Sequence, residues 1–242
     1  MSNKRFSAAV LAALIFQTFV LGEELASPSF VDVTQQAGID AHHRFGDDDL
    51  SNIVEGTGAG AMFFDYDGDG WLDIYLLNGC WLSDVNDNRG RKYRGKLTNR
   101  LYRNGQDGTF RDVTERVGVG DKGYGVGSSA ADFDGDGDLD LYVLNYGKNV
   151  FYRNNGNGTF TDITDQTGLG NAQWSLAAPW FDYDGDGDLD VYVVNYLKYD
   201  SGKFRSYYAA AGYPGPLSYE GSPDTLYRNN GDGTFTDVTK EA

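Results

Sequence analysis

Three short segments of the chain carry carboxylates at a spacing that suits the binding of a positive charge. They read DYDGDGWLD (Asp65 to Asp73), DFDGDGDLD (Asp132 to Asp140) and DYDGDGDLD (Asp182 to Asp190). Each has aspartate at its first, third, fifth and ninth positions, and the last two have a further aspartate at the seventh. Carboxylates this close together repel one another unless a cation lies between them. Because the costly pattern is repeated, we interpret it as a repeated cation site.

The ligand types in these segments match the preferences of Ca²⁺, which takes about six to eight oxygen ligands from carboxylates, backbone carbonyls and water. Alternating aspartates direct carboxylates inward, and the glycines between them allow the chain to turn sharply. The seventh position of the first segment is Trp71, so only a backbone carbonyl is available there. We therefore predict about three Ca²⁺ ions, one for each segment. The predicted side-chain ligands are Asp65, Asp67, Asp69 and Asp73, then Asp132, Asp134, Asp136 and Asp140, then Asp182, Asp184, Asp186 and Asp190. The predicted carbonyl ligands are those of Trp71, Asp138 and Asp188.

Other interpretations of the acidic segments fit less well. An EF-hand needs a glutamate at position 12 and flanking helices, whereas position 12 is Leu76, Val143 or Val193. Mg²⁺ is disfavoured by the number of carboxylates, and Zn²⁺ by the scarcity of histidine and cysteine. A turn rich in aspartate and glycine with no ion is the remaining alternative, and three copies in register argue against it.

The elements that must position these segments recur in a fixed order. Each segment is followed by an apolar run (IYLLN, LYVLNY or VYVVNY), then by LYRN or FYRN, then by a glycine turn and a short strand such as DGTFRDVT. The apolar runs lack alternation, which predicts strands buried on both faces. The Asp-Gly and Asn-Gly pairs predict tight hairpin turns. One unit therefore consists of a strand, the acidic loop, two strands, a hairpin turn and a last strand.

Sheets that are buried on both faces and repeated in tandem predict an all-β fold of the β-propeller type. The units span about residues 57–114, 125–164 and 175–239. A β-sandwich or linear solenoid is the alternative, and it predicts alternation that the central strands lack. FVDVTQQAGI (30–39) repeats the end of a unit, which predicts an orphan N-terminal strand. Since propellers close with about four to eight blades, we expect these three blades to form an incomplete arc. We therefore expect the chain to be the N-terminal part of a longer protein. Its partner would then be the further C-terminal blades or a further domain of that protein.

The composition limits the partners of this protein. The formal net charge is −16, and most of the excess acid lies in the three loops. Nucleic acid and anionic membrane surfaces are therefore disfavoured. RGRKYRGK (89–96) is the main basic stretch, and we interpret it as a solvated loop.

The N-terminus predicts export from the cytoplasm. Residues 1–22 contain a basic start, an apolar run from about Ala8 to Leu21 and small residues before a cleavage site near Gly22, a pattern typical of a signal peptide. The run is shorter than the ~20 apolar residues of a membrane-spanning helix, so we expect no membrane span in the mature chain. The mature domain, residues 23–242, is expected to be secreted or extracytoplasmic, in the periplasm or at the cell surface. Cys80 is the single cysteine, so an internal disulfide is excluded and metal is the expected staple.

Two insertions are expected to carry the ligand surface. They span roughly Cys80 to Thr98 and Lys198 to Thr225. Propeller rim loops often bind ligands, and exposed tyrosines are good anchors. An equally weighted alternative is that the second insertion packs its own tyrosines over a blade. The candidate surface residues are Tyr207, Tyr208, Tyr213 and Tyr219.

With these motifs in view, the chain resembles the FG-GAP/VCBS calcium repeats of integrin-α-type propellers over about residues 30–242. EGTGAGAMFFDYDGDGWLDIYLLNG (55–79), with YPGPL (213–217) in a later insertion, is similar more specifically to the cartilage-acidic-protein and ASPIC/UnbV group. The resemblance implies a secreted calcium-binding propeller, often followed by a C-terminal ASPIC/UnbV domain. That domain is absent from this sequence, so no function of that domain is carried over.

Three functions are weighed. The first is a non-catalytic module that binds an extracellular protein or glycan, for example in adhesion. The second is the scaffold of a secreted hydrolase or lyase that acts on an extracellular polymer. Its candidate residues are His42 and His43 beside Asp47, Asp48 and Asp49, or Glu55, or tyrosines and arginines of the long insertion. Cys80 is interpreted as a structural thiol, because no base for a nucleophile is identifiable. No local catalytic motif supports these residues, so we expect no catalytic site. A calcium sensor is disfavoured because the repeats offer no bistable helix pair.

Overall fold

The computed structural model describes residues 29–57, 60–201 and 213–242. It divides into two compact units, residues 1–32 and 33–242, and the architecture below is that of the second unit. The predicted signal peptide, residues 1–22, lies outside the described residues. Within the described part of the chain, no helix has both the length and the apolar character that crossing a membrane requires.

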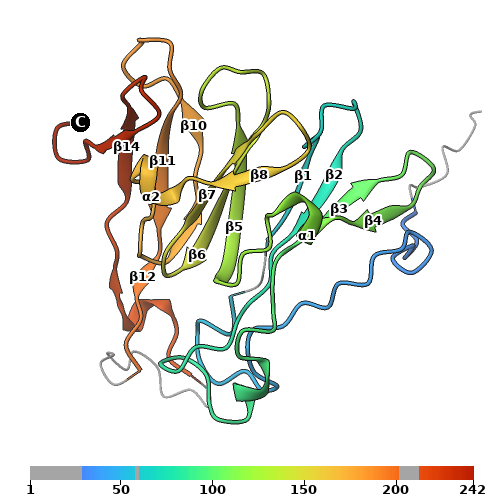
Figure 1. Ribbon diagram of the computed structural model, residues 1–242. Coiled ribbons are helices and arrows are strands. Elements are labelled where there is room, and N and C mark those ends of the chain that lie inside the picture. The colour runs from blue at the N-terminus through green and yellow to red at the C-terminus, as the bar shows by residue number, and fades with distance from the viewer. Residues whose placement is uncertain (1–28, 58–59, 202–212) are drawn as a thin grey trace, which may run out of the picture. The chain divides into compact units, whose positions relative to one another are not determined.

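Residues 33–242 fold into three stacked antiparallel sheets and one small sheet (Figure 1). The first sheet consists of β1 (Ala61–Phe64), β2 (Asp73–Leu76), β3 (Arg100–Asn104) and β4 (Phe110–Asp112). The second consists of β5 (Tyr124–Ala131), β6 (Asp140–Tyr146), β7 (Val150–Asn154) and β8 (Phe160–Asp162). The third consists of β9 (Ser175–Ala177), β10 (Trp180–Phe181), β11 (Asp190–Asn195), β14 (Thr225–Asn229) and β15 (Phe235–Asp237). The small sheet pairs β12 (Leu197–Lys198) with β13 (Glu220–Gly221).

The first two sheets follow the order that the sequence predicts: a strand, the acidic loop, two strands, a hairpin turn and a last strand. The third follows it with the first strand divided into β9 and β10, which both pair with β11. The middle strands are buried on both faces, as their unbroken apolar runs indicate. In β6 every residue from Asp140 to Asn145 is buried, so side chains of both orientations are covered by neighbouring sheets. Nearly all regular structure is β, and the stacked sheets form an incomplete arc of the propeller type, which confirms the predicted fold class.

The hairpin turns also match the sequence expectation. The glycines before the last strands, Gly108, Gly158 and Gly233, have φ of 84°, 76° and 83°. In each turn the preceding aspartate or asparagine accepts hydrogen bonds from the backbone N–H and the hydroxyl of the following threonine. This short-range chemistry fixes the turn without help from the rest of the fold.

The sheets are held together by two shared hydrophobic clusters. The first joins the first and second sheets, with Tyr75 and Leu101 packed near Leu141 and Val143. The second joins the second and third sheets around Phe133, Tyr142, Phe151, Val191 and Tyr227. The innermost strands approach closely, since a Cβ on Gly127 would lie 2.4 Å from the carbonyl oxygen of Leu176. The small residues of β5 are therefore required by the distance between neighbouring strands.

A one-turn helix follows the last strand of the first two units and links each sheet to the next. These helices are α1 (Thr114–Val117) and α2 (Thr164–Thr167), and each ends at a left-handed glycine. A Cβ on Gly118 or Gly168 would lie 3.4 or 3.5 Å from the carbonyl oxygen of Phe160 or Phe235 in the following sheet. The same contact therefore recurs from sheet to sheet.

The predicted orphan N-terminal strand is wrong as a strand. Within residues 30–39 the chain forms a turn at Thr34 to Gly38, and the first strand of the described chain is β1. The matching segments become strands because each pairs with the Tyr-Arg-Asn strand of its own unit. The turn nevertheless keeps the linking contact, because a Cβ on Gly38, where φ is 77°, would lie 2.9 Å from the carbonyl oxygen of Phe110.

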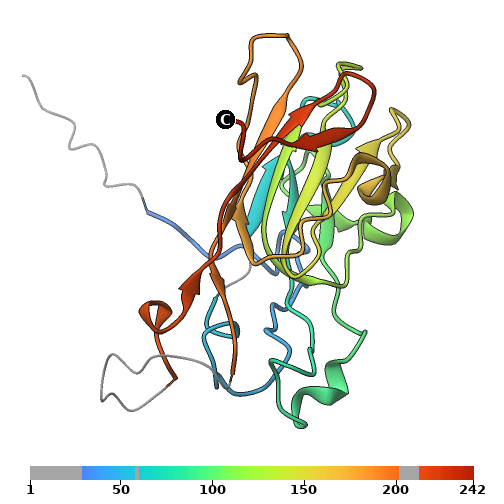
Figure 2. The same ribbon diagram turned by 90° about the vertical axis from the view of Figure 1, so that its left-hand side faces the viewer.

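The described parts of the insertions lie at the opposite end of the sheets from the acidic loops (Figure 2), because they follow the central strand that the acidic loop precedes. A third hydrophobic cluster forms there from both insertions and from residues near Val54, around the buried Trp174. Two short 3-10 helices occur in this region, η1 (Gly90–Tyr93) and η2 (Pro216–Ser218). The basic stretch 89–96 is thus not only a solvated loop, since η1 lies within it and its Lys92 pairs with Asp48.

Candidate metal centres

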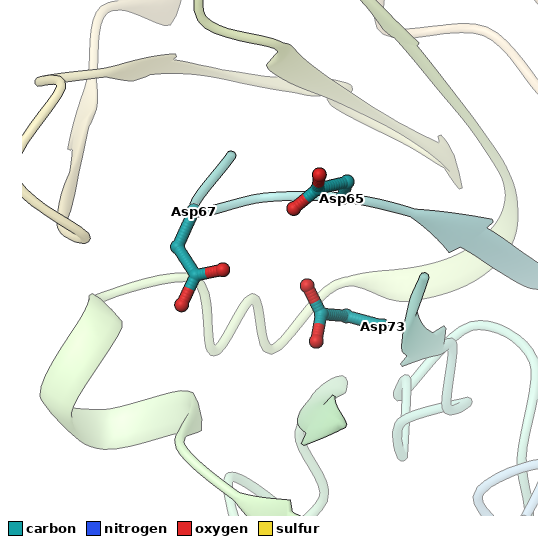
Figure 3. A group of neighbouring side chains, drawn as sticks. All are labelled: Asp65, Asp67 and Asp73. Carbon is teal, nitrogen blue, oxygen red and sulfur yellow. The ribbon is translucent and has the colours of Figure 1, made fainter. Parts of the chain in front are cut away.

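The first acidic loop brings carboxylates from both of its flanking strands together. Asp65 follows β1, Asp67 lies in the loop, and Asp73 begins β2. Their carboxylates turn toward a common point (Figure 3), and one oxygen from each lies within 4.8 Å of the others. Two ligands on opposite sides of one Ca²⁺ are about 5 Å apart, since each Ca–O distance is about 2.3 to 2.6 Å. The spacing therefore fits a single hard cation.

Equivalent groups occur in the other two loops, although their membership differs. The second group is Asp132, Asp134 and Asp136, and the third is Asp182, Asp184 and Asp190. The structure thus brings together three of the four predicted side-chain ligands in each loop. The predicted ligands outside the groups are Asp69, Asp140 and Asp186. The predicted carbonyl ligands, those of Trp71, Asp138 and Asp188, stay predictions.

The loops are wound around the aspartate at their first position. Asp65 accepts hydrogen bonds from the N–H groups of Asp69 and Gly70, at 3.1 and 2.8 Å. Asp132 accepts from Asp136 and Gly137 in the same way, at 3.1 and 3.0 Å. The glycines at the fourth and sixth loop positions all have positive φ. These positions suit glycine because a Cβ strains the left-handed backbone.

The aspartate at the ninth position ties the acidic loop to the third strand. Asp140 is buried and accepts hydrogen bonds from the N–H groups of Phe133 in its loop, at 3.1 Å, and of Asn154 in β7, at 2.8 Å. Asp73 and Asp190 make the same pair of bonds in their units. Each of these aspartates therefore holds its loop in place even where its oxygens are turned away from the other carboxylates.

Burial makes the carboxylates of Asp73 and Asp140 costly to ionise without a cation. It raises the pKa of Asp73 to about 6 and that of Asp140 to about 7, partly offset by the backbone N–H groups that they accept. A cation in the loop would lower both pKa values, because an opposite charge nearby favours the ionised form. Binding of a metal to these loops would therefore release protons.

One buried oxygen supports a metal directly. The Oδ1 atom of Asp67 is buried and has no hydrogen-bond partner, although a buried carboxylate oxygen without a partner costs free energy. The ligand set of the three groups consists of carboxylates only. The residues present therefore fit a hard, oxygen-preferring cation.

Sequence reasoning missed an asparagine that joins neighbouring units. It is the last residue of the Tyr-Arg-Asn motif. The side-chain amide of Asn154 donates to the carbonyl of Tyr66 in the preceding unit, at 2.8 Å. Asn229 donates to the carbonyl of Phe133 in the same way, at 3.1 Å. The motif is the same in all three units, and this repetition was the sequence signal that the asparagine has a role. The carbonyl that it contacts lies in another unit, and no sequence pattern marks it.

Several residues considered for catalysis instead make contacts with the first insertion. Glu55 is buried and accepts hydrogen bonds from Ser51 and from the side chain of Asn86. Asp48 pairs with Lys92, and Asp49 pairs with Arg89. Burial lowers the pKa of His43, and among the described residues no carboxylate hydrogen-bonds to it. The described contacts of Glu55, Asp48 and Asp49 are thus hydrogen bonds and ion pairs that connect the segment around residues 48–55 to the first insertion.

Cys80 is buried in the third hydrophobic cluster, and this burial raises the pKa of its thiol to about 12. Because the thiolate is the reactive form, we expect iodoacetamide to label the folded chain at pH 8 at least about 100-fold more slowly than the chain unfolded in urea. Mass spectrometry of timed samples measures both rates. Equal rates would show that Cys80 is accessible and ionised in the folded protein.

The four tyrosines predicted to form the ligand surface differ in whether the structure describes them and in how exposed they are. Tyr207 and Tyr208 lie outside the described residues. Tyr219 is half-buried and packs on Tyr199 with ring centroids 5.6 Å apart, as the packing alternative predicts. Tyr213 is 40% exposed, and its hydroxyl packs against Gly56, since a Cβ on that glycine would lie 2.3 Å from it. The role of Tyr213 in ligand binding stays a prediction.

Antiparallel sheets of four or five strands are stacked in tandem, and each has an acidic loop that leads into a buried central strand, which defines the chain as a propeller-type repeat protein. The model of the FG-GAP-like repeat family matches residues 65–143 and 132–193, which together span more than half of the sequence, and the chain belongs to this family. No curated protein matches the chain.

Proposed function

We propose that the chain is a calcium-stabilised propeller module that is exported from the cell and binds an extracellular protein or glycan. The observation that carries the calcium proposal is the convergence of three aspartate groups at a spacing suited to one cation each. The unpartnered Oδ1 of Asp67 adds to it. Calcium would supply positive charge that the loops lack and would connect the start of the second strand to the end of the first.

The ligands would be the aspartates that sequence and structure both place in the loops. In each loop the first and third positions lie in the converging group. The third member is the ninth-position aspartate in the first and third loops and the fifth-position aspartate in the second. The remaining ligands would be Asp69, Asp140 and Asp186. Magnesium is less suitable, because it keeps several waters and rarely uses so many protein carboxylates.

The proposed ligand surface lies on the insertions, away from the acidic loops. There the exposed side chains of Tyr213 and Leu217 lie within the second insertion. Rim loops positioned by a rigid scaffold are common binding sites. Export is supported by the signal-like residues 1–22, and membership of the ASPIC/UnbV group is supported by the motifs at 55–79 and 213–217.

The calcium proposal is tested by isothermal titration of the metal-free chain. We expect Ca²⁺ to bind at least about tenfold more tightly than Mg²⁺. Replacing the first-position aspartate of one loop, as in Asp132→Asn, should remove about one equivalent of bound calcium. A matched control is Asp165→Asn, since Asp165 is exposed on α2 and outside the loops. Equal affinity for the two metals, or an unchanged stoichiometry in Asp132→Asn, would refute the proposal.

A further inference from the structure

The first acidic loop differs from the other two in ways that the repeat pattern conceals. Arg103, the arginine of its Tyr-Arg-Asn motif, donates from Nε to Asp67 at 2.5 Å and from a terminal nitrogen to Asp69 at 2.7 Å. The matching arginines, Arg153 and Arg228, form no ion pair within 4.0 Å in the described part of the chain. A cation entering the first loop must therefore compete with a guanidinium that already holds two of its carboxylates.

A second side chain closes the same loop. Gln106 donates from Nε2 to the carboxylate of Asp69 at 3.2 Å. It has φ of 63°, whereas the matching residues Gly156 and Gly231 have φ of 67° and 70°. Glutamine in the left-handed region is strained, and glycine is not. The strained residue is therefore kept at a position where its side chain reaches the acidic loop.

The exchange of glycine for Gln106 is matched by a second exchange inside the loop. A Cβ on Gly156 would lie 2.8 Å from the carboxylate of Asp138, and one on Gly231 would lie 2.9 Å from that of Asp188. The corresponding loop position in the first unit is Trp71, so no carboxylate occupies that space. The first loop thus loses one carboxylate and gains a side chain in its place.

We propose that the first acidic loop binds calcium more weakly than the other two and fills last, because Arg103 and Gln106 hold its carboxylates. This inference rests on the proposed calcium function. The charge difference acts in the same direction, since the first loop has four aspartates and the others have five. In oxygen-ligand sites, fewer ligand charges lower the affinity for calcium. Occupancy of the first loop would therefore follow the calcium concentration over a range in which the other loops are full.

Calcium titration of the full chain tests the proposal by calorimetry and by tryptophan fluorescence. We expect two tighter equivalents and one at least about tenfold weaker. Trp71 is 48% exposed and lies in the first loop, so its emission should change in the weak phase. In Trp71→Phe, which keeps the backbone carbonyl, that change should disappear.

Two variants address the closing side chains. Arg103→Gln should tighten the weak phase about fivefold, the change expected when one partly exposed ion-pair network is removed. Gln106→Gly should tighten it by a smaller factor and also raise the melting temperature of the metal-free chain, because it removes backbone strain. Arg153→Gln is the matched control, and it should leave the weak phase unchanged.

The outcomes separate this proposal from the proposed function. Three equal affinities, a Trp71 signal in the tight phase, or a weak phase unaltered by both Arg103→Gln and Gln106→Gly would overturn the ranking of the loops and leave calcium binding intact. A chain that is folded by circular dichroism and binds no calcium would overturn the proposed function and the ranking with it.

Discussion

Chelation of calcium is expected to lower the melting temperature of the protein by roughly 15 to 30 °C. A ligand at 100 times its dissociation constant stabilises the folded state by about 2.7 kcal/mol per site, so three sites give about 8 kcal/mol. For a domain of this size each kcal/mol corresponds to about 2 to 4 °C. The effect is large because no internal disulfide holds the loops in place. The chain has a single cysteine and so cannot form one.

Thermal unfolding followed by circular dichroism measures this shift in excess calcium, in excess magnesium and in chelator. Magnesium is the control for a general effect of divalent charge, and it should restore only a small part of the loss. A chelated chain that remains folded and melts at the same temperature as the calcium-loaded chain would contradict the stabilising role.

Replacement of Asn154 by alanine is expected to destabilise the protein by about 3 kcal/mol. Asn154 is 2% exposed, and its amide donates to the carbonyls of Tyr66 at 2.8 Å and Leu139 at 3.2 Å. The variant leaves both carbonyls without this partner and removes a bond between two units. Urea unfolding in the presence of calcium measures the difference in the free energy of unfolding.

Two asparagines of the same chain serve as controls for Asn154→Ala. Asn155 is adjacent but half-exposed and bonds to threonines within its own hairpin, so Asn155→Ala should cost less than about 1 kcal/mol. Asn104 occupies the equivalent position in the first unit, and its amide donates to Leu72 of its own unit. Asn104→Ala should therefore be intermediate. Similar losses for all three variants would show that the link between units contributes little.

Much of the fold was predictable from local chemistry. The apolar runs identified the central strands β2, β6 and β11, because strands buried on both faces need no alternation. The Asp-Gly and Asn-Gly pairs placed the hairpin turns at positions such as Gly108, where φ is 84°. The acidic loops were recognisable from spacing alone. These features depend on residues that are neighbours in the sequence.

The features that sequence reasoning missed depend on partners in other units. Residues 30–39 match a strand motif but form no strand, so the motif alone gave the wrong structure there. The bond from Asn154 to Tyr66 crosses 88 residues of sequence. The closure of the first loop did leave a sequence signal, because Gln106 stands where the other units have glycine. Only the coordinates show that its side chain reaches Asp69.

The number of calcium ions bound to the purified chain tests the central claim most directly. Native mass spectrometry in the presence of calcium should show three bound ions, and Asp65→Asn, Asp132→Asn and Asp182→Asn should each remove one, because each aspartate belongs to a separate converging group. A folded chain that retains no ion, or a chain whose ion count is the same in all three variants, would contradict the assignment of calcium to the acidic loops.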